Sequence, residues 1–476
     1  MIRRWTGLVA LAATLSGCGG GGGGTAATST ATTTTATTAG GTSCSLADRQ
    51  AWALAQLQEW YLFPETLPTN VNPASYTTVS DYIDALTANA RAQGRDRYFS
   101  YLTSIASEDA YYNSGASAGF GVRLSTDAVN RRVYIAEAFE GAPALAAGID
   151  RGAEIVAIGT TAADLRTVSA IIAAEGTAGV TTALGPNTAG TTRLLRISDA
   201  AGTRDVSVAK ADYSLTPVSS RYGAKIIADN GRQVGYLNLR TFITTADPAL
   251  RQAFASFRAA GVTNVVIDLR YNGGGLVSIA ELIGDLLGAA RSTSDVVDYT
   301  VFRPEKASNN TTRYFQPTAQ SIAPMKLAFI GTGGTASASE LTINAQIPYL
   351  HPNAALIGTN TYGKPVGQIA LDRAACDDRF RIIAFATQNS ARTSGYFTGL
   401  ASVVEASCQA GDDLTHPLGD PAEASTRAAL DFIAGKSCTR IADASVGTQS
   451  ATGEGKRELL TPAHPDTAQR ETPGLF

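Results

Sequence analysis

Twice in this chain, an apolar run leads into a glycine-rich turn that is followed by a helical pattern. The first unit covers residues 265–287, with its glycine turn at 272–275, and the second runs from residue 327 to a helix that starts near Ser337. Strands and helices continue to alternate over residues 218–437. Such alternation is typical of an α/β domain, so we expect an α/β core built from a mixed sheet with flanking helices.

Two regions with other patterns precede this core. Apolar residues recur at helical spacing over residues 44–113, which predicts a small N-terminal helical domain. Short strands with Gly-rich turns fill residues 114–217, which predicts a β-rich domain. Residues 438–476 are polar and unpatterned, so we expect a disordered tail there. The expected fold class is therefore multidomain α/β.

The first 43 residues have the pattern of a targeting segment and a tether. Two arginines precede an apolar stretch at 5–15, which is too short to span a membrane as a stable anchor. The following Leu-Ser-Gly-Cys resembles the lipobox of bacterial lipoproteins, which implies lipidation of Cys18. We expect a signal peptide at 1–17, a Gly/Thr-rich tether at 18–43, and export to the periplasmic side of the outer membrane or the cell surface. An ordinary secretory signal with an accidental cysteine is the alternative.

Four cysteines remain outside the signal region: Cys44, Cys376, Cys408 and Cys438. An even number in an exported protein favours two disulfides, and their spacing matches no zinc-binding pattern. Of the three pairings that four cysteines allow, we favour Cys376–Cys408 together with Cys44–Cys438. Four free thiols are the alternative.

The histidines argue against a Ser–His–Asp triad. The chain has three, His351, His416 and His464, and each directly precedes a proline, a context that favours turns and loop ends. A serine hydrolase without a positioned imidazole can use a lysine whose pKa is lowered by burial. The Gly-x-Ser-x-Gly match around Ser117 is discounted, because a strand rather than a helix follows it.

Three motifs carry a more specific signal. Residues 268–275 read Asp-Leu-Arg-Tyr-Asn-Gly-Gly-Gly, residues 333–340 read Gly-Gly-Thr-Ala-Ser-Ala-Ser-Glu, and residues 361–364 read Thr-Tyr-Gly-Lys, with Gln368 following. In this order they resemble the signature of the tail-specific, or C-terminal processing, serine proteases. The resemblance extends over about residues 45–435.

Several positions depart from that signature, two of them in or beside the motifs. Thr335 stands where the family has serine, and Pro365 follows the lysine where glycine is common. These departures concern substrate choice and regulation more than the type of reaction.

The resemblance implies a role for each motif residue. Ser337 would be the nucleophile, Lys364 the general base and then the acid, and Gln368 the partner that holds the lysine. An oxyanion hole would come from the N–H of Ala338 with that of Gly273 or Gly274. Glu340 and Thr361 match supporting positions of the family. Ser339 is the alternative nucleophile. This chemistry needs no metal or cofactor.

The β-rich domain resembles the PDZ insert of the same family at residues 119–124 and 141–149. The resemblance implies that the N–H groups of Phe120 and Gly121 face a substrate's C-terminal carboxylate. The strand that begins at Val122 would then add the peptide as a further strand. A plain β-domain that packs on the core is the alternative.

These expectations together predict a serine endopeptidase that captures protein or peptide substrates by their C-terminal ends and cleaves them by Ser–Lys acyl-enzyme chemistry. A non-catalytic peptide-binding lipoprotein with the same fold is the second hypothesis, and a Ser–Lys hydrolase of small acyl substrates is the third. The net charge of −3 gives no reason to expect nucleic acid as a partner. The membrane would be a partner through Cys18, and the sequence is compatible with a homo-oligomer.

Overall fold

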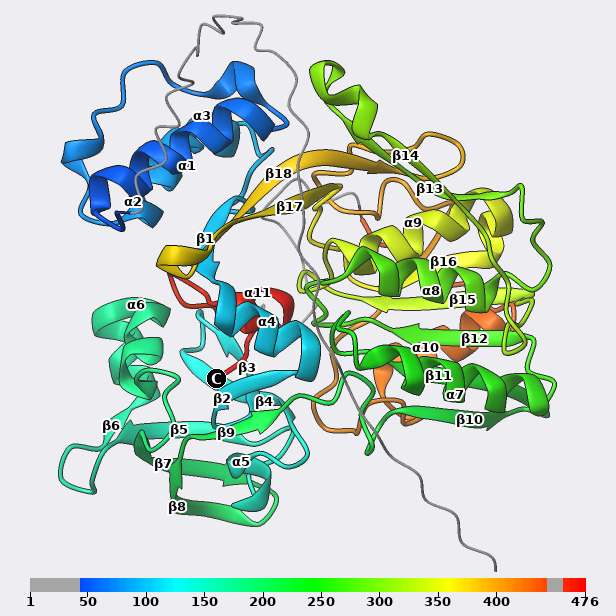
Figure 1. Ribbon diagram of the computed structural model, residues 1–476. Coiled ribbons are helices and arrows are strands. Elements are labelled where there is room, and N and C mark those ends of the chain that lie inside the picture. Colours follow the sequence, from blue (N-terminus) through cyan, green and yellow to red (C-terminus); the bar gives the residue numbers. More distant parts are fainter. Residues whose placement is uncertain (1–42, 443–456) are drawn as a thin grey trace, which may run out of the picture. The chain divides into compact units, whose positions relative to one another are not determined.

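The computed structural model describes residues 43–442 and 457–476 (Figure 1). Residues Ser43–Phe476 form one compact unit. The expected division of this unit into domains at residues 113 and 217 remains a prediction. The expected signal peptide, tether and Cys18 lie outside the described residues. None of the described helices combines the length and the apolar character that crossing a membrane requires.

The predicted α/β core is built on a six-stranded sheet with the order β10-β11-β12-β15-β16-β19. Only β10 runs antiparallel to its neighbour, so the sheet is mixed as expected. The strands are β10 (Ala224–Asp229), β11 (Arg232–Asn238), β12 (Asn264–Asp268), β15 (Lys326–Gly331), β16 (Ala354–Gly358) and β19 (Ala406–Gln409).

Helices cover both faces of this sheet (Figure 1). They are α7 (Ala246–Ala259), α8 (Val277–Leu287) and α9 (Ala338–Leu350) on one face and α10 (Ala424–Ile433) on the other. Val265 and Ile267 of β12 join the apolar core with α7, α8 and α9, whereas Val266 joins the core with α10. Successive side chains of a strand point to opposite faces, so a strand buried on both faces must be apolar throughout.

The two glycine turns lie at the same edge of this sheet. Strands β12 and β15 are parallel neighbours, and Asp268 is in register with Ile330. Because each turn follows the carboxyl end of its strand, the two turns come together there, which is where ligands bind in open α/β sheets.

The β-rich part contains a seven-stranded sheet with the order β20-β3-β4-β5-β7-β8, in which β6 also pairs with β5, and a two-stranded sheet of β2 and β9. Their bounds, with those of two helices, are β2 (Ala116–Gly119), β3 (Val122–Asp127), β4 (Arg132–Ala138), α5 (Pro143–Ala146), β5 (Glu154–Gly159), β6 (Arg166–Thr167), α6 (Val168–Leu184), β7 (Thr192–Asp199), β8 (Gly202–Ala209), β9 (Ala211–Ser214) and β20 (Arg457–Leu459). Ile171 of α6 packs in the core of this sheet with Leu124 and Ile135.

A five-stranded sheet, which the sequence did not predict, links the N-terminal helices to the core (Figure 1). Its order is β1-β18-β13-β14, and β17 also pairs with β18. The elements are α1 (Leu46–Trp60), α2 (Val79–Leu86), α3 (Ala88–Ala92), β1 (Tyr101–Ser104), α4 (Ile105–Ser114), β13 (Val296–Phe302), β14 (Thr311–Tyr314), β17 (Val366–Arg373) and β18 (Asp378–Gln388). Phe380 and Ile382 of β18 pack with Leu57 of α1 and Ile83 of α2, so the helical pattern at 44–113 gains its core from a distant strand.

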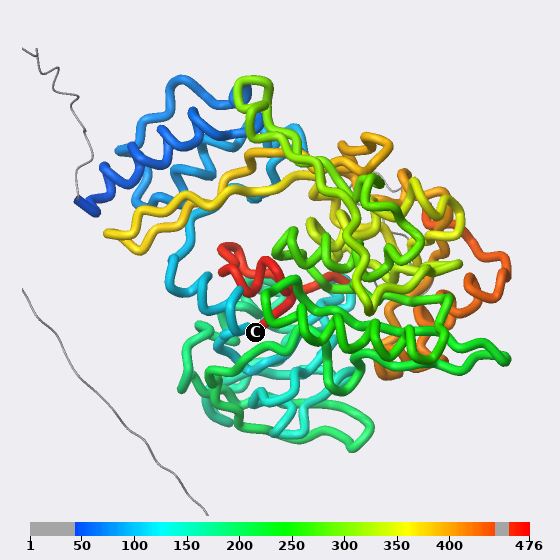
Figure 2. Tube along the Cα trace, turned by 45° about the vertical axis from the view of Figure 1, so that its right-hand side comes forward, coloured from blue at the N-terminus to red at the C-terminus, as the bar shows by residue number. Residues whose placement is uncertain are grey.

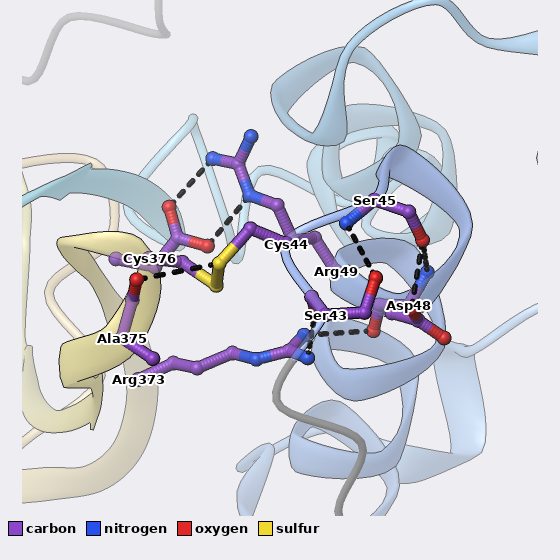
Figure 3. Close-up of a disulfide and its surroundings, with 9 residues drawn as sticks. Ser43, Cys44, Ser45, Asp48, Arg49, Arg373, Ala375 and Cys376 are labelled. Atoms are coloured by element: carbon purple, nitrogen blue, oxygen red, sulfur yellow. Dashed lines mark hydrogen bonds and ion pairs between the residues drawn. A yellow bond between two sulfur atoms is a disulfide. The ribbon is translucent and has the colours of Figure 1, made fainter.

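All four remaining cysteines form disulfides, but both favoured pairings are wrong. Cys44 pairs with Cys376, as Figure 3 shows, and Cys408 pairs with Cys438. Cys44 precedes α1, whose Arg49 forms an ion pair with Asp378, and this contact brings the start of α1 to the turn that holds Cys376. The chain after Cys438 runs beside β19, since the Gln409 N–H donates to the Thr439 carbonyl oxygen, and this places Cys438 near Cys408.

The two disulfides enclose loops of very different length, with sequence separations of 332 for Cys44–Cys376 and 30 for Cys408–Cys438. A longer loop restricts the unfolded chain more, so replacing both Cys44 and Cys376 by serine should lower the free energy of unfolding by about 2–5 kcal/mol. Denaturant unfolding checks this, with the double serine variant of the shorter loop as control. A larger loss for the shorter loop would contradict the expectation.

The expected disordered tail differs from the structure over residues 457–476. This stretch contains β20 and the helix α11 (Thr467–Glu471), and β20 pairs with β3. Its polar composition gives no local signal, because the order comes from hydrogen bonds to a strand more than 300 residues earlier, with separations such as 332 between Thr126 and Glu458.

Candidate active site

The backbone of Asn272 joins the two glycine turns. Its carbonyl oxygen accepts hydrogen bonds from the Ala336 N–H and the Ser339 hydroxyl, both at 3.0 Å. Its side-chain amide donates to the Leu239 carbonyl oxygen at 2.8 Å and its Oδ1 accepts from the Gly274 N–H at 3.0 Å. The first two bonds fix the first glycine turn against the segment that carries Ser337, and the other two hold the turn to Leu239 and to itself.

Ser337 occupies the position expected of a nucleophile. It directly precedes α9 and has φ 56° and ψ −115°, a conformation that costs a non-glycine residue of order 1–3 kcal/mol. Such strain persists where the surroundings over-determine it, which is common at nucleophile turns. A Cβ at Gly274 would lie 2.8 Å from the Ser337 Cβ, so only glycine allows the two turns to approach this closely.

The hydroxyl of the alternative nucleophile, Ser339, already has a hydrogen-bond acceptor. The Ser339 side chain is 0% exposed, and its hydroxyl donates a hydrogen bond to the Asn272 carbonyl oxygen. Thr335, which replaces the family's first serine, is buried in the same way and donates to the Leu269 carbonyl oxygen at 2.9 Å. Ser337, by contrast, is partly exposed.

The carboxylate of Glu340 connects the nucleophile segment to the lysine turn. Its Oε2 accepts from the Ser337 N–H at 3.1 Å and from the Lys364 N–H at 2.7 Å. Its Oε1 accepts from the Gly363 N–H at 2.7 Å and the Thr361 hydroxyl at 2.6 Å. Burial raises the pKa of Glu340, and these four donors oppose that rise. The backbone atoms of Ser337 and Lys364 are therefore bound to one oxygen atom.

The side chain of Lys364 lies in surroundings that suit a general base. Its Nζ donates to the Gln368 Oε1 at 2.9 Å and lies 5.3 Å from the ring centroid of Phe99. Burial lowers the pKa of Lys364, an effect that the nearby Glu471 carboxylate opposes. Within the described ranges, no hydrogen bond joins the Lys364 Nζ to the Ser337 Oγ.

The N-terminal helical part supplies site residues that the sequence did not identify. The Gln368 amide donates to the Phe99 carbonyl oxygen, and the Arg97 guanidinium donates to the carbonyl oxygens of Tyr362 and Gly363, each at 2.7 Å. The helical pattern of this region predicts only a core. It gives no sign that Arg97 contacts Gly363, which lies 266 residues later in the chain.

Arg270 lies just before the first glycine turn and binds two buried carboxylates. Its Nε donates to both oxygens of Asp268, at 2.9 and 3.0 Å, and its two Nη atoms donate to the two oxygens of Glu423, each at 2.8 Å. All three side chains are 0% exposed. The sequence motif indicated a turn here, but Glu423 lies 153 residues away and its partnership with Arg270 had no local signal.

The two glycines expected at an oxyanion hole differ in what their N–H groups contact. The Gly274 N–H donates to the Asn272 Oδ1, whereas the Gly273 N–H donates at 3.0 Å to the backbone carbonyl oxygen of Glu471. The Gly273 N–H is therefore already bound to a carbonyl oxygen of the chain itself. An oxyanion hole likewise binds a carbonyl oxygen through backbone N–H groups.

The residues expected to bind a peptide also have a contact within the chain. The N–H groups of Gly121 and Val122 donate to the backbone oxygen of Phe476 at 2.9 and 3.2 Å. The Phe120 side chain is buried and packs with that of Phe476 in one apolar cluster.

The discounted residues lie elsewhere. Ser117 lies within β2, which pairs with β9, so it has no strand-to-helix turn. His351 follows the opposite end of α9 from Ser337 and contacts Glu405, while His416 contacts Asp413 and His464 is exposed.

The sequence matches two models of one family. A model described as Peptidase S41 N-terminal domain matches residues 48–101, and one described as Peptidase family S41 matches residues 233–393. The second range contains both glycine turns, Ser337, Lys364 and Gln368.

Known proteins agree with this match. A carboxyl-terminal-processing protease of Picosynechococcus sp. is 28% identical over 261 residues, which cover 53% of this chain and 55% of that protein. The chloroplastic carboxyl-terminal-processing peptidase 3 of Arabidopsis thaliana is 27% identical over 260 residues, which cover 53% of this chain and 46% of that protein. The matches thus span about half the length of these curated relatives.

The fold agrees as well. The crystal structure of a protein from Bacteroides fragilis that is described as an S41 protease superposes with a TM-score of 0.61 at 22% identity, over 81% of this chain and 97% of that one. A multidomain α/β fold, two family models in consecutive order and curated relatives of one kind lead to the same result: this chain belongs to peptidase family S41, the C-terminal processing proteases.

Proposed function

We propose that this chain is a serine endopeptidase that cleaves protein or peptide substrates with Ser337 as nucleophile and Lys364 as general base. The observation that carries the proposal is the shared Glu340 oxygen, which binds the N–H groups of both residues. The strained backbone of Ser337 and the lowered pKa of Lys364 support it, because a nucleophile must be presented and a lysine base must be neutral.

In this mechanism, neutral Lys364 takes the proton of the Ser337 hydroxyl as its Oγ attacks the substrate carbonyl carbon. The negative charge that develops on the carbonyl oxygen is bound by the N–H groups of Gly273 and Ala338. Lys364 then gives the proton to the leaving amine, and water hydrolyses the acyl-enzyme by the reverse sequence of transfers. Gln368 orients the Lys364 Nζ through their hydrogen bond of 2.9 Å.

Substrate capture is the second part of the proposal. The β3 strand and the Phe120–Gly121 turn would act as a PDZ-like site for C-terminal ends of substrates, which add to β3 by strand pairing. A lipid anchor at Cys18 would hold the enzyme on the periplasmic side of the outer membrane or at the cell surface.

The rate should depend on pH through Lys364. Its pKa lies below the ordinary value for lysine because burial disfavours the charged form. The neutral, active form becomes more abundant as pH rises through this lowered pKa, so kcat/KM should rise with pH and level off below about pH 10, near the ordinary lysine pKa. A pH series of kcat/KM with a peptide substrate measures this. A rate that falls as pH increases from neutral would contradict it.

The test of the function compares residues 43–476, which form one compact unit, with the same chain carrying Ser337→Ala. Each is incubated with an unfolded protein, and the products are identified by mass spectrometry. Fragments from the wild-type chain alone support the proposal and give the cleavage preference. Fragments from both chains would exclude Ser337 as the nucleophile.

A non-catalytic peptide-binding lipoprotein is the second candidate. It is favoured by the occupied Gly273 N–H and by the lack of a direct Ser337–Lys364 hydrogen bond within the described residues. Peptide binding without cleavage, under conditions in which an acylating probe fails to label Ser337, would support it.

A further inference from the structure

The stretch 457–476 follows one edge of β3 at both of its ends. Its first part, β20, pairs antiparallel with β3, with Leu459 opposite Ser125. Its last part continues along the same edge in the same direction, with Leu475 opposite Arg123 and the Phe476 N–H donating to the Val122 carbonyl oxygen at 2.9 Å. The stretch therefore occupies the edge that an added substrate strand would need.

Between these two ends the stretch leaves β3 and reaches the first glycine turn. The Glu471 carbonyl oxygen accepts the Gly273 N–H at 3.0 Å, and a Cβ at Gly273 would lie 2.2 Å from the Arg470 carbonyl oxygen. Helix α11 lies beside α4, and both Figure 1 and Figure 2 show this red segment next to the cyan one. A substrate carbonyl cannot bind the Gly273 N–H while Glu471 is there.

The side chains of the stretch near Gly273 are buried and hydrogen-bonded. Glu471 is 4% exposed and accepts a hydrogen bond from the Tyr112 hydroxyl of α4 at 3.1 Å. Its carboxylate also faces Lys364 and favours the charged, non-basic form of that lysine. The Thr472 hydroxyl contacts the Tyr111 hydroxyl at 3.0 Å.

Arg123 connects this occupied site to the β3 edge. Its side chain is buried, and its Nη1 donates to the Pro473 carbonyl oxygen at 2.6 Å and to the Tyr271 carbonyl oxygen at 2.8 Å. One guanidinium thus binds both the stretch and the residue that directly precedes the first glycine turn. The Phe476 side chain, 2% exposed, fills the apolar cluster behind β3.

The chain bound at Gly273 is helical rather than extended. Residues 467–471 are helical, and the Thr472 N–H donates to the Ala468 carbonyl oxygen at 2.8 Å. The peptide bond after Glu471 is therefore part of a hydrogen-bonded helical turn, whereas strand pairing with a protease presents an extended chain.

We propose that residues 457–476 are a built-in ligand that closes the active site, and that peptides displace it when they pair with β3 and place a large apolar side chain where Phe476 lies. The proposal rests on the proposed function for its effect on cleavage. Its ligand part stands on contacts alone: the β3 pairing, the buried Phe476 and the bond between Gly273 and Glu471.

The test releases the stretch without touching the catalytic residues. Phe476→Asp and Leu475→Asp each put a charge into an apolar site that is 2% or 1% exposed, and Val129→Asp makes the same kind of change at a side chain that is 80% exposed. All three substitutions are made in the Ser337→Ala chain, so that cleavage of the peptide cannot disturb the measurement of its binding. The probe is a fluorescent peptide with the sequence of residues 466–476.

The expected result is binding of the peptide to both release variants at least about tenfold more tightly than to the Val129→Asp control, because a competing internal ligand lowers the competent fraction. Equal binding by the control and by release variants that keep the control's unfolding midpoint would overturn the proposal. Two release variants are used so that a folding defect in one leaves the other to decide.

A second measurement separates this proposal from the proposed function. With Ser337 restored, both release variants should cleave an unfolded protein at least about tenfold faster than the Val129→Asp control. If no variant cleaves but the peptide still distinguishes release from control, the ligand role stands and the protease function fails. If all cleave at one rate and bind the peptide equally, the protease function stands and the built-in ligand is excluded.

Discussion

Replacing Lys364 by alanine should reduce kcat by about 10²–10⁴-fold while the fold is retained, because removal of a general base leaves the Ser337 hydroxyl as a weak nucleophile. Among the described residues, the side chain donates one hydrogen bond, to Gln368 at 2.9 Å, and the backbone N–H that Glu340 binds is still present in alanine. Initial rates on an unfolded protein substrate measure the loss, and an unchanged denaturant midpoint shows that the fold remains.

A matched control is Lys326→Ala. Lys326 begins β15, at the opposite end of that strand from the nucleophile turn, and donates to the Phe432 carbonyl oxygen at 3.0 Å. Its replacement removes a lysine with a similar hydrogen bond but should leave kcat unchanged. A Lys364→Ala enzyme as active as the Lys326→Ala enzyme would rule out Lys364 as the base.

Replacing Arg270 by methionine should lower the free energy of unfolding by about 3–5 kcal/mol, because it leaves buried carboxylates without their partner. Asp268 and Glu423 are both 0% exposed, and each accepts two hydrogen bonds from this guanidinium. Arg270 lies two residues before Asn272, so we also expect the first glycine turn to lose its fixed position and activity to fall.

Arg251→Met is the control for this prediction. Arg251 forms an ion pair with Asp247 one helical turn earlier in α7, and the two side chains are 37% and 42% exposed. Pairs of this kind contribute only about 0.2–0.5 kcal/mol, so the denaturant midpoint should barely move. If the two variants unfold at the same denaturant concentration, the buried network does not stabilise the chain as argued.

The sequence predicts the parts of the fold that depend on local pattern. The strand at 265–269 and the helix at 278–287 correspond to β12 and α8, because burial on both faces requires an apolar run and the glycine turn marks where it ends. The motif at 333–340 likewise leads to a partly exposed Ser337 before α9.

Features that depend on distant partners escaped prediction. Strand β1 has four residues and pairs with β18, far along the chain, so neither strand has a pattern that indicates the five-stranded sheet. The disulfides depend on where α1 and the chain after β19 lie, and cysteine spacing contains no such information. The same reason explains why β20 and α11 were expected to be disordered: their order is set by β3 and α4.

The site divides in the same way. The motifs identified Ser337, Lys364, Gln368 and Glu340 as a group, but they could not identify Phe99, whose backbone carbonyl binds the Gln368 amide. Backbone atoms take part in a site whatever their side chain, so residue types alone cannot reveal them.

The bond between Cys44 and Cys376 determines how mechanical load enters the molecule. A pulling force on the chain before Ser43 reaches Cys44 first and passes through a covalent bond to the turn at Ala374–Cys376, which joins β17 to β18. Helix α1 follows Cys44 and is therefore shielded from that force. With the disulfide reduced, the same pull would act on α1 and on the Arg49–Asp378 ion pair.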